Sequence, residues 1–117
     1  MRLKQAIGSA AILAISASAA LAVEKPAQFW NLISSTVMSF ELSKAGANAF
    51  GANLTTNDPD GSVDHDERLK LPGVASGEYD IRLKLKDGRT CFARGVKIAA
   101  GKVFSLEDKN LVDCTKA

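Results

Sequence analysis

The sequence predicts an all-β protein: a small antiparallel β-sandwich of six to seven strands, preceded by an apolar signal-peptide helix. Three observations lead to this prediction. Beyond the N-terminal leader, apolar and polar residues alternate over short runs, which is the period of a half-buried strand. Turn-forming pairs such as Pro-Gly and Asp-Gly separate these runs, and no stretch after the leader has a strong helical period. Short strands with turns between them are typical of a sandwich.

The first segment of the chain has the parts of an export signal. It has a basic start at Arg2 and Lys4, then an apolar stretch rich in small residues. The stretch ends in Ala20-Leu21-Ala22, the small-x-small pattern that signal peptidase accepts. We therefore expect cleavage between Ala22 and Val23.

Two alternatives remain open for this leader. The cut falls after Ala19, or the segment stays in place as a membrane anchor. A spanning helix needs about 20 strongly apolar residues, whereas Ala6–Leu21 is shorter and is diluted by Gly8 and by serines. The sequence therefore favours a signal peptide over residues 1–22 and a single β-sandwich domain over residues 23–117, with no membrane span in the mature chain.

Removing the leader also removes the apparent basicity of the chain. The whole sequence has 15 basic and 13 acidic residues, a formal net charge of +2. Arg2 and Lys4 leave with the leader, so the remaining charges balance. Net charge therefore gives no indication of nucleic acid as a partner.

Two cysteines, Cys91 and Cys114, lie in the exported part. An even number of cysteines in an exported chain indicates a disulfide bond. Closing a loop of this kind typically contributes about 2–4 kcal/mol, which is important in a domain below about 100 residues because its core is thin. Two thiols alone would make an incomplete zinc site, since zinc takes about four ligands. We predict a Cys91–Cys114 disulfide.

Two strands are expected in the first half of the domain. Phe29–Ser34 is apolar and compatible with a strand. Thr36–Leu42 alternates, which is expected to place Met38 and Phe40 on the same side. A helix over Phe29–Lys44 is the competing interpretation, but the β-branched residues favour strands.

The second half is organised around Asp87-Gly88, the strongest two-residue hairpin signal. A turn centred there pairs Leu83 with Phe92, which is expected to place Phe92 on the apolar side with Tyr79. Gly95 indicates a bulge in the second strand of the hairpin. Two further strands are expected over Val103–Leu106 and Asn110–Cys114.

The acidic segment Thr56–Glu67 is the best candidate for a metal site. Aligned as a twelve-residue calcium loop, it has oxygen-bearing side chains at the ligand positions and a glycine at the sharp turn. The predicted ligands are Asp58, Asp60, Ser62, Asp64 and Glu67. Thr56 stands where such loops carry an aspartate, and the flanks resemble loop and strand rather than helices. A solvated acidic turn is the alternative. Apart from calcium here, no cofactor is expected.

A basic surface face is also expected, formed by alternate residues of one strand and a neighbour across the turn: Arg82, Lys84, Lys86 and Arg89. Single-stranded nucleic acid would need aromatic rings beside these charges, and Tyr79 and Phe92 are expected on the other side. The face is interpreted as a solvated exterior, or as a binding surface for an unknown envelope protein or an anionic surface.

Two residues that occur once in the chain, a histidine and a tryptophan, are further site candidates. His65 is the only histidine, and no serine motif accompanies it, so a surface position is expected rather than a catalytic one. Trp30 is the only tryptophan, and packing in the core is expected for it because aromatic residues dominate small cores.

Two resemblances to known families follow from these segments. The rhythm of Gly77-Glu78-Tyr79 and Val96–Lys102 resembles transthyretin-like and carboxypeptidase-regulatory-like sandwiches, which implies the fold only. Asp58–Leu69, Asp87–Cys91 and Val103–Glu107 resemble a family of small exported bacterial proteins of unknown function, some of which carry the label argininosuccinate lyase.

The lyase label is rejected for this chain. The lyases are long helical proteins with a serine-bearing flexible loop, and residues 23–117 contain no such loop. The resemblance therefore implies an exported domain without catalytic residues. Together these patterns predict a periplasmic or extracellular binding or structural module that is not an enzyme, with a calcium-stabilised module as the alternative.

Overall fold

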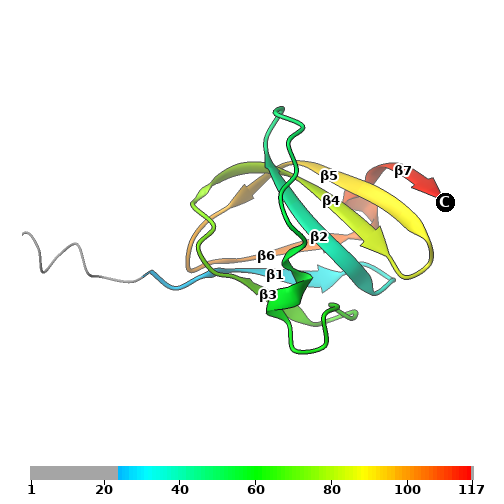
Figure 1. Ribbon diagram of the computed structural model, residues 1–117, viewed down its shortest axis with the longest axis horizontal. Coiled ribbons are helices and arrows are strands. Elements are labelled where there is room, and N and C mark those ends of the chain that lie inside the picture. Colours follow the sequence, from blue (N-terminus) through cyan, green and yellow to red (C-terminus); the bar gives the residue numbers. More distant parts are fainter. Residues whose placement is uncertain (1–23, 117) are drawn as a thin grey trace, which may run out of the picture.

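The computed structural model describes residues 24–116, which form seven strands in two sheets (Figure 1). The smaller sheet has the order β3 (Arg68–Leu71), β1 (Ala27–Leu32), β6 (Val103–Glu107). The larger sheet has the order β2 (Val37–Lys44), β4 (Gly77–Leu85), β5 (Arg89–Ile98), β7 (Val112–Lys116). The all-β prediction of six to seven strands is confirmed. The predicted signal peptide and its cleavage site lie outside the described residues.

The pairing of β1 shows where the topology departs from prediction. β1 pairs antiparallel with β3 but parallel with β6, so the sandwich is not wholly antiparallel. A parallel pair needs a long connection, and here β2 to β5 lie between the two strands in the chain. The bounds of β3 were not predicted, although a strand was expected beside the acidic segment that precedes it. The helical alternative for residues 29–44 is wrong, because β1 and β2 occupy this stretch.

The hydrophobic core lies between the two sheets. Alternation along β1 turns Phe29 inward, where its ring centroid lies 4.8 Å from that of Phe40 on β2. Tilted aromatic pairs at this distance are favourable beyond the area that they bury. Asn31 is also fully buried, and its side-chain amide donates to the Val63 carbonyl at 2.9 Å. The other large side chains with no more than 2% exposure are Ile33, Val37, Val63, Leu69, Leu71, Ile81, Leu83 and Ile98.

A register shift in β2 changes which side chains face the core. Val37 is opposite Leu85 and Ser39 is opposite Lys84, so Met38 is an extra residue between the pairs. Such a bulge reverses the alternation of the strand. Val37 and Phe40 are consequently both buried, while Met38 is 44% exposed. The prediction that Met38 shares a side with Phe40 is wrong for this reason.

The β4–β5 hairpin forms where it was predicted, but its turn has three residues, 86–88, instead of the two residues Asp87-Gly88, and its pairing is displaced by one residue. Leu83 is opposite Cys91 rather than Phe92, and Phe92 is opposite Arg82. A one-residue displacement moves every side chain of a strand to the other side. Phe92 therefore lies on the outer side of the larger sheet, not in the core.

The predicted bulge at Gly95 is present. Arg94 and Gly95 together oppose Asp80, because the pairing shifts between Tyr79 with Val96 and Ile81 with Ala93. Gly95 has a φ of 63°, a conformation that suits glycine. Beyond the bulge, Tyr79 is paired with Val96.

Two short 3-10 turns lie between the two sheets, one at each edge of the sandwich. Leu54–Asn57 contacts both β2 and β3, and Asp108–Asn110 joins β6 to β7. Among the residues that the structure describes, no helix has the length and apolar character needed to cross a membrane.

Candidate functional site

The candidate site is the outward side of the larger sheet, which we call the outer face. It is formed by alternate residues of three strands that lie opposite one another in the pairing. The face consists of Ser39, Glu41 and Ser43 from β2, Asp80, Arg82 and Lys84 from β4, and Thr90, Phe92 and Arg94 from β5, with Phe50 from the following loop above them.

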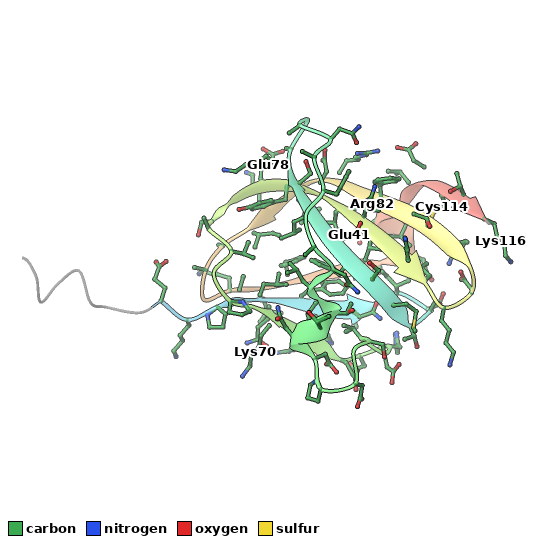
Figure 2. All side chains as sticks on the ribbon, viewed as in Figure 1. Glu41, Lys70, Glu78, Arg82, Cys114 and Lys116 are labelled. Carbon is green, nitrogen blue, oxygen red and sulfur yellow. A yellow bond between two sulfur atoms is a disulfide. The ribbon has the colours of Figure 1, made fainter. Side chains whose placement is uncertain are left out.

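Arg82 stands at the centre of the outer face (Figure 2). Its Nε donates to Oε1 of Glu41 at 2.6 Å, and its guanidinium carbon lies 4.6 Å from the centroid of the Phe50 ring. The side chain is 36% exposed, whereas that of Glu41 is 15% exposed. Within residues 24–116, the hydrogen bond of the Arg82 side chain comes from Nε, and no hydrogen bond is found from its two terminal nitrogens. They are therefore available to an external anion.

A stack of two aromatic rings with an arginine at each end crosses the outer face. The centroids of Phe50 and Phe92 are 5.7 Å apart, and the guanidinium carbon of Arg94 lies 4.2 Å from the centroid of Phe92. With Arg82 over Phe50, four side chains from three segments form one continuous stack. Cation–π contacts of this kind contribute about 0.5–1 kcal/mol each at exposed sites. They fasten the loop that carries Phe50 to the sheet.

This stack was missed by sequence reasoning. Phe92 was expected in the core because the hairpin was given a register one residue away from the real one. Phe50 lies in an irregular loop, where no period indicates direction. Gly95 was the one sequence signal that could have indicated this position. A bulge changes the side of the sheet to which the neighbouring side chains point.

Asp80 closes the end of the outer face that lies away from the hairpin turn. Its carboxylate accepts hydrogen bonds from the backbone N–H groups of Gly46 and Gly95, both at 3.0 Å. The Gly46 bond, then the Gly95 bond, hold the pKa of Asp80 below its ordinary value, and the Arg94 charge adds to this. Nη1 of Arg94 lies 3.7 Å from Oδ2 of Asp80, and its Nη2 lies 3.4 Å from Oδ2 of Asp113 on β7. The charge of Arg94 at this end is therefore already balanced by two carboxylates.

The opposite end of the outer face is positive. Lys84 is exposed and lies between Ser39 and Thr90 on the neighbouring strands, and Lys86 follows it into the turn. Neither lysine has an ion-pair partner among the described residues. Arg82, Lys84 and Lys86 thus form the basic surface that the sequence predicted.

Arg89, the fourth predicted member of that surface, is elsewhere. The displaced register places it two residues from Cys91 on the same side of β5, facing away from Arg82. Its Nη2 lies 2.9 Å from Oδ2 of Asp87. The hydrogen bond from the Arg89 side chain is the main cause of the lowered pKa of Asp87. The prediction that Arg89 joins the basic face is wrong because the pairing differs by one residue.

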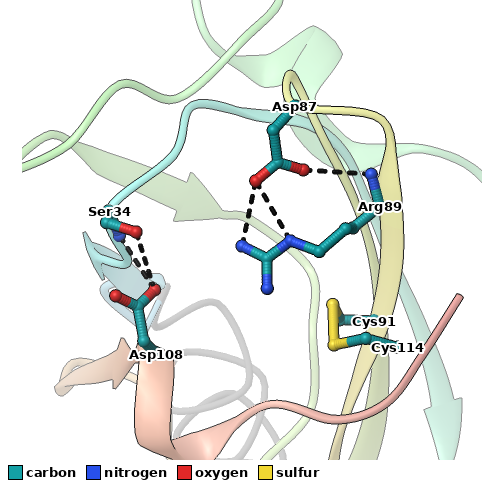
Figure 3. Close-up of a disulfide and its surroundings, with 6 residues drawn as sticks. All are labelled: Ser34, Asp87, Arg89, Cys91, Asp108 and Cys114. Atoms are coloured by element: carbon teal, nitrogen blue, oxygen red, sulfur yellow. Dashed lines mark hydrogen bonds and ion pairs between the residues drawn. A yellow bond between two sulfur atoms is a disulfide. The ribbon is translucent and has the colours of Figure 1, made fainter. Parts of the chain in front are cut away.

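Arg89 instead borders the predicted disulfide, which is confirmed (Figure 3). Cys91 and Cys114 are bonded, with their Cα atoms 4.0 Å apart. Cys91 is buried in the core, whereas Cys114 lies on the exposed edge strand β7. Nearby, Asp108 accepts hydrogen bonds from the backbone N–H and the hydroxyl of Ser34, which lower its pKa.

The carboxylates of the predicted calcium loop form separate local bonds. Oδ1 of Asp58 accepts from the Asp60 N–H, Oδ1 of Asp64 accepts from the Thr36 hydroxyl, and Oε1 of Glu67 accepts from the Asp64 N–H. In the described part of the chain, no three histidine, cysteine, aspartate or glutamate side chains gather closely enough to hold a metal ion. The calcium prediction, with Ser62 as a further ligand, gains no support from this geometry.

The single histidine and the single tryptophan both lie at the surface of the sandwich. His65 is exposed, and its Nδ1 lies 2.9 Å from the Ile33 carbonyl oxygen. Trp30 is not in the core: it lies on the outward side of the smaller sheet, where its indole N–H donates to Asp66 at 2.9 Å and Arg68 stacks on its ring. The core prediction for Trp30 failed because Phe29, its neighbour on β1, takes the inward position.

Two adjoining hollows lie at the end of the sandwich near Val74, with volumes of about 550 and 380 Å³. Their lining is mainly aliphatic, proline and glycine residues, and Lys44 is the one charged residue of the smaller hollow. Neither hollow is lined by His65 or by a carboxylate pair.

Comparison with known proteins adds no relative: no protein-family model, no curated protein and no solved structure matches this chain.

Proposed function

We propose that this chain is an exported, non-catalytic binding module that presents its outer face to an anionic partner. The observation that carries the proposal is the state of Arg82. This side chain is held in place by Glu41 and Phe50, and no hydrogen bond to an acceptor among the described residues is found from either terminal nitrogen. An arginine that is already ordered loses less entropy when it binds, so less of the interaction energy is lost.

The positive half of the face supports the same proposal. Lys84 and Lys86 extend the charge of Arg82 toward the hairpin turn, while the acidic residues of the face lie beside Arg82 or beyond it. A concentrated field of one sign attracts an oppositely charged partner and speeds association.

Export is proposed from two independent features. The first residues of the chain have the pattern of a signal peptide. The Cys91–Cys114 bond is of the kind that persists outside the reducing cytoplasm. The proposed location is the periplasm or the extracellular space, and the resemblance to a family of small exported bacterial proteins agrees with it.

The absence of a catalytic role is proposed from what surrounds the titratable groups. His65 is exposed and contacts a backbone carbonyl, and no nucleophile among residues 24–116 is hydrogen-bonded to it. General acid–base or nucleophilic catalysis needs such a group within hydrogen-bonding reach.

Retention on a poly-glutamate matrix tests the binding proposal. The purified protein should be retained at low ionic strength and eluted by salt, because screening weakens exposed charges. The Lys84→Gln and Lys86→Gln double variant should elute at lower salt. Lys70→Gln, an exposed lysine on the smaller sheet (Figure 2), is the matched control and should elute like the native protein. Equal elution of all three proteins would contradict the assignment of the face.

A further inference from the structure

We infer that the outer face binds an extended acidic segment of a partner protein, with carboxylates at alternate positions, and that Arg82 anchors one of them. This inference rests on the proposed function and specifies the partner. Its support comes from spacing, from the state of Arg82 and from the distribution of charge along β4.

The spacing of the cations matches that of an extended peptide. Arg82 and Lys84 are two residues apart on β4 and point to the same side. Alternate residues of a strand are roughly 6.6–6.8 Å apart. An extended acidic peptide repeats its own alternate side chains at this distance, so successive carboxylates can meet successive cations. Lys86 continues the row beyond the strand.

Arg82 is arranged to receive a carboxylate. Glu41 accepts from Nε, and within the described chain the two terminal nitrogens of Arg82 make no further hydrogen bond. The planar fork matches two carboxylate oxygens. The Phe50 ring stacks on the guanidinium, with its centroid 4.6 Å from the guanidinium carbon, and restricts its orientation. Arg82 is therefore held in one orientation, with its terminal nitrogens able to bind a carboxylate.

Charge along β4 sets the direction of the bound segment. Asp80 and Asp113 lie around Arg94, and they would repel a carboxylate placed there. Beyond Arg82 in the other direction, Lys84 has only the hydroxyl residues Ser39 and Thr90 opposite it. The acidic segment is therefore expected to run from Arg82 toward the hairpin turn.

The same stack disfavours single-stranded nucleic acid. Binding of that ligand uses open aromatic faces on which bases stack. Here Arg82 lies over Phe50 and Arg94 lies over Phe92, and the two rings also contact each other. The rings are thus occupied by the protein's own side chains, whereas the cations remain available.

Two labelled peptides of identical composition test the spacing. One alternates Glu and Thr, and the other has all its Glu residues in one block followed by all its Thr residues. Fluorescence anisotropy with the whole protein at low ionic strength should give a lower Kd for the alternating peptide. Arg82→Gln should raise that Kd at least about tenfold, the effect expected for losing a charge-assisted contact.

Lys84→Gln is the second variant, in case loss of Arg82 impairs folding. Lys84 is exposed and has no ion pair in the described chain, so its replacement is not expected to disturb the fold. It should raise the Kd about threefold, as for an exposed charge. Lys70→Gln should leave the Kd unchanged. Equal affinity for the two peptides, or no effect of either variant at the outer face, would overturn the inference.

Two further probes separate this inference from the proposed function. They are oligothymidylate and phosphatidylglycerol vesicles, tested with the same variants. If either probe binds in a Lys84-dependent way while the alternating peptide does not, the outer face stands as an anion-binding surface and the inference of an acidic segment is wrong. If no anionic probe binds, both proposals fall.

Discussion

Asp80 shows how one side chain can hold two irregular segments. Both its oxygens accept backbone hydrogen bonds, one from Gly46 after β2 and one from Gly95 in the bulge of β5. Both donors are glycines with positive φ, so neither segment has a regular strand partner at this point. A buried carboxylate that accepts charge-assisted bonds from such donors replaces the missing ladder contacts.

The lowered pKa of Asp80 leads to a prediction about acid stability. A pKa that is lower in the folded state than its ordinary value of 3.8 means that the carboxylate stabilises the fold above that pH. This stabilisation is lost as the pH falls through the folded pKa. Asp80→Asn should lower Tm by several degrees at pH 7, and its Tm should fall less steeply below pH 4 than that of the native protein.

Thermal melts followed by circular dichroism between pH 2 and pH 7 would provide the comparison. Asp113→Asn is the matched control, because Asp113 is exposed and contacts only Arg94 across the edge. Its melting curve should follow the native curve. If Asp80→Asn and Asp113→Asn behave alike, the clamp assigned to Asp80 is incorrect.

At the scale of the element, β7 depends on its disulfide. All five of its residues are exposed, so the strand buries almost no apolar side chain. Its pairing with β5 is interrupted between Thr90 and Phe92. Cys114 is bonded to the buried Cys91, and this bond is the connection between β7 and the core.

Loss of this bond is therefore expected to release the strand. Cys114→Ser should reduce the free energy of unfolding by about 2–4 kcal/mol. Backbone amides of Val112–Lys116 should exchange rapidly with deuterium, while those of β4 stay protected. Val112→Ala, an exposed change in the same strand, should leave exchange nearly unchanged. Slow exchange of β7 in Cys114→Ser would show that pairing alone holds it.

The β4–β5 hairpin shows what could and what could not be predicted for an element. Its turn, its apolar alternation and the bulge at Gly95 are visible in the sequence because each depends on local residue preferences. The register near the turn is off by one residue, because it is decided by which side chains fit the core. Cys91 took the inward position that Phe92 was expected to fill.

For the whole molecule, the export proposal predicts a shortened chain. Mass spectrometry of the protein recovered from an expressing bacterium should give an N-terminus at Val23, or at Ala20 if the alternative cut is used. The fraction that holds it should be the periplasm or the medium. An intact N-terminus in the cytoplasmic fraction would refute export.

Calcium addition tests the remaining alternative for the molecule. Because the carboxylates of Asp58, Asp64 and Glu67 are engaged in separate local bonds, we expect no common site for an ion. Tm in millimolar calcium should equal Tm in chelator for the native protein and for Asp60→Asn. A rise in Tm with calcium that Asp60→Asn abolishes would restore the calcium site, since a ligand of the folded state raises stability.

The sequence alone determined the all-β class, the positions of most strands and the partner of each cysteine. These follow from period-two alternation, turn residues and cysteine parity, which are properties of the chain itself. It also indicated the basic row of Arg82, Lys84 and Lys86, because alternation along one strand gives a common side.

Only the tertiary structure decided how the strands meet and which residues surround Arg82. The parallel pairing of β1 with β6, the bulge at Met38 and the outward position of Phe92 arise from packing between segments that are distant in the sequence. One extra residue in a strand exchanges its two sides. That displacement carried Phe92 to the outer face and removed Arg89 from it. The aromatic stack and the open nitrogens of Arg82 exist only once the sheet has closed.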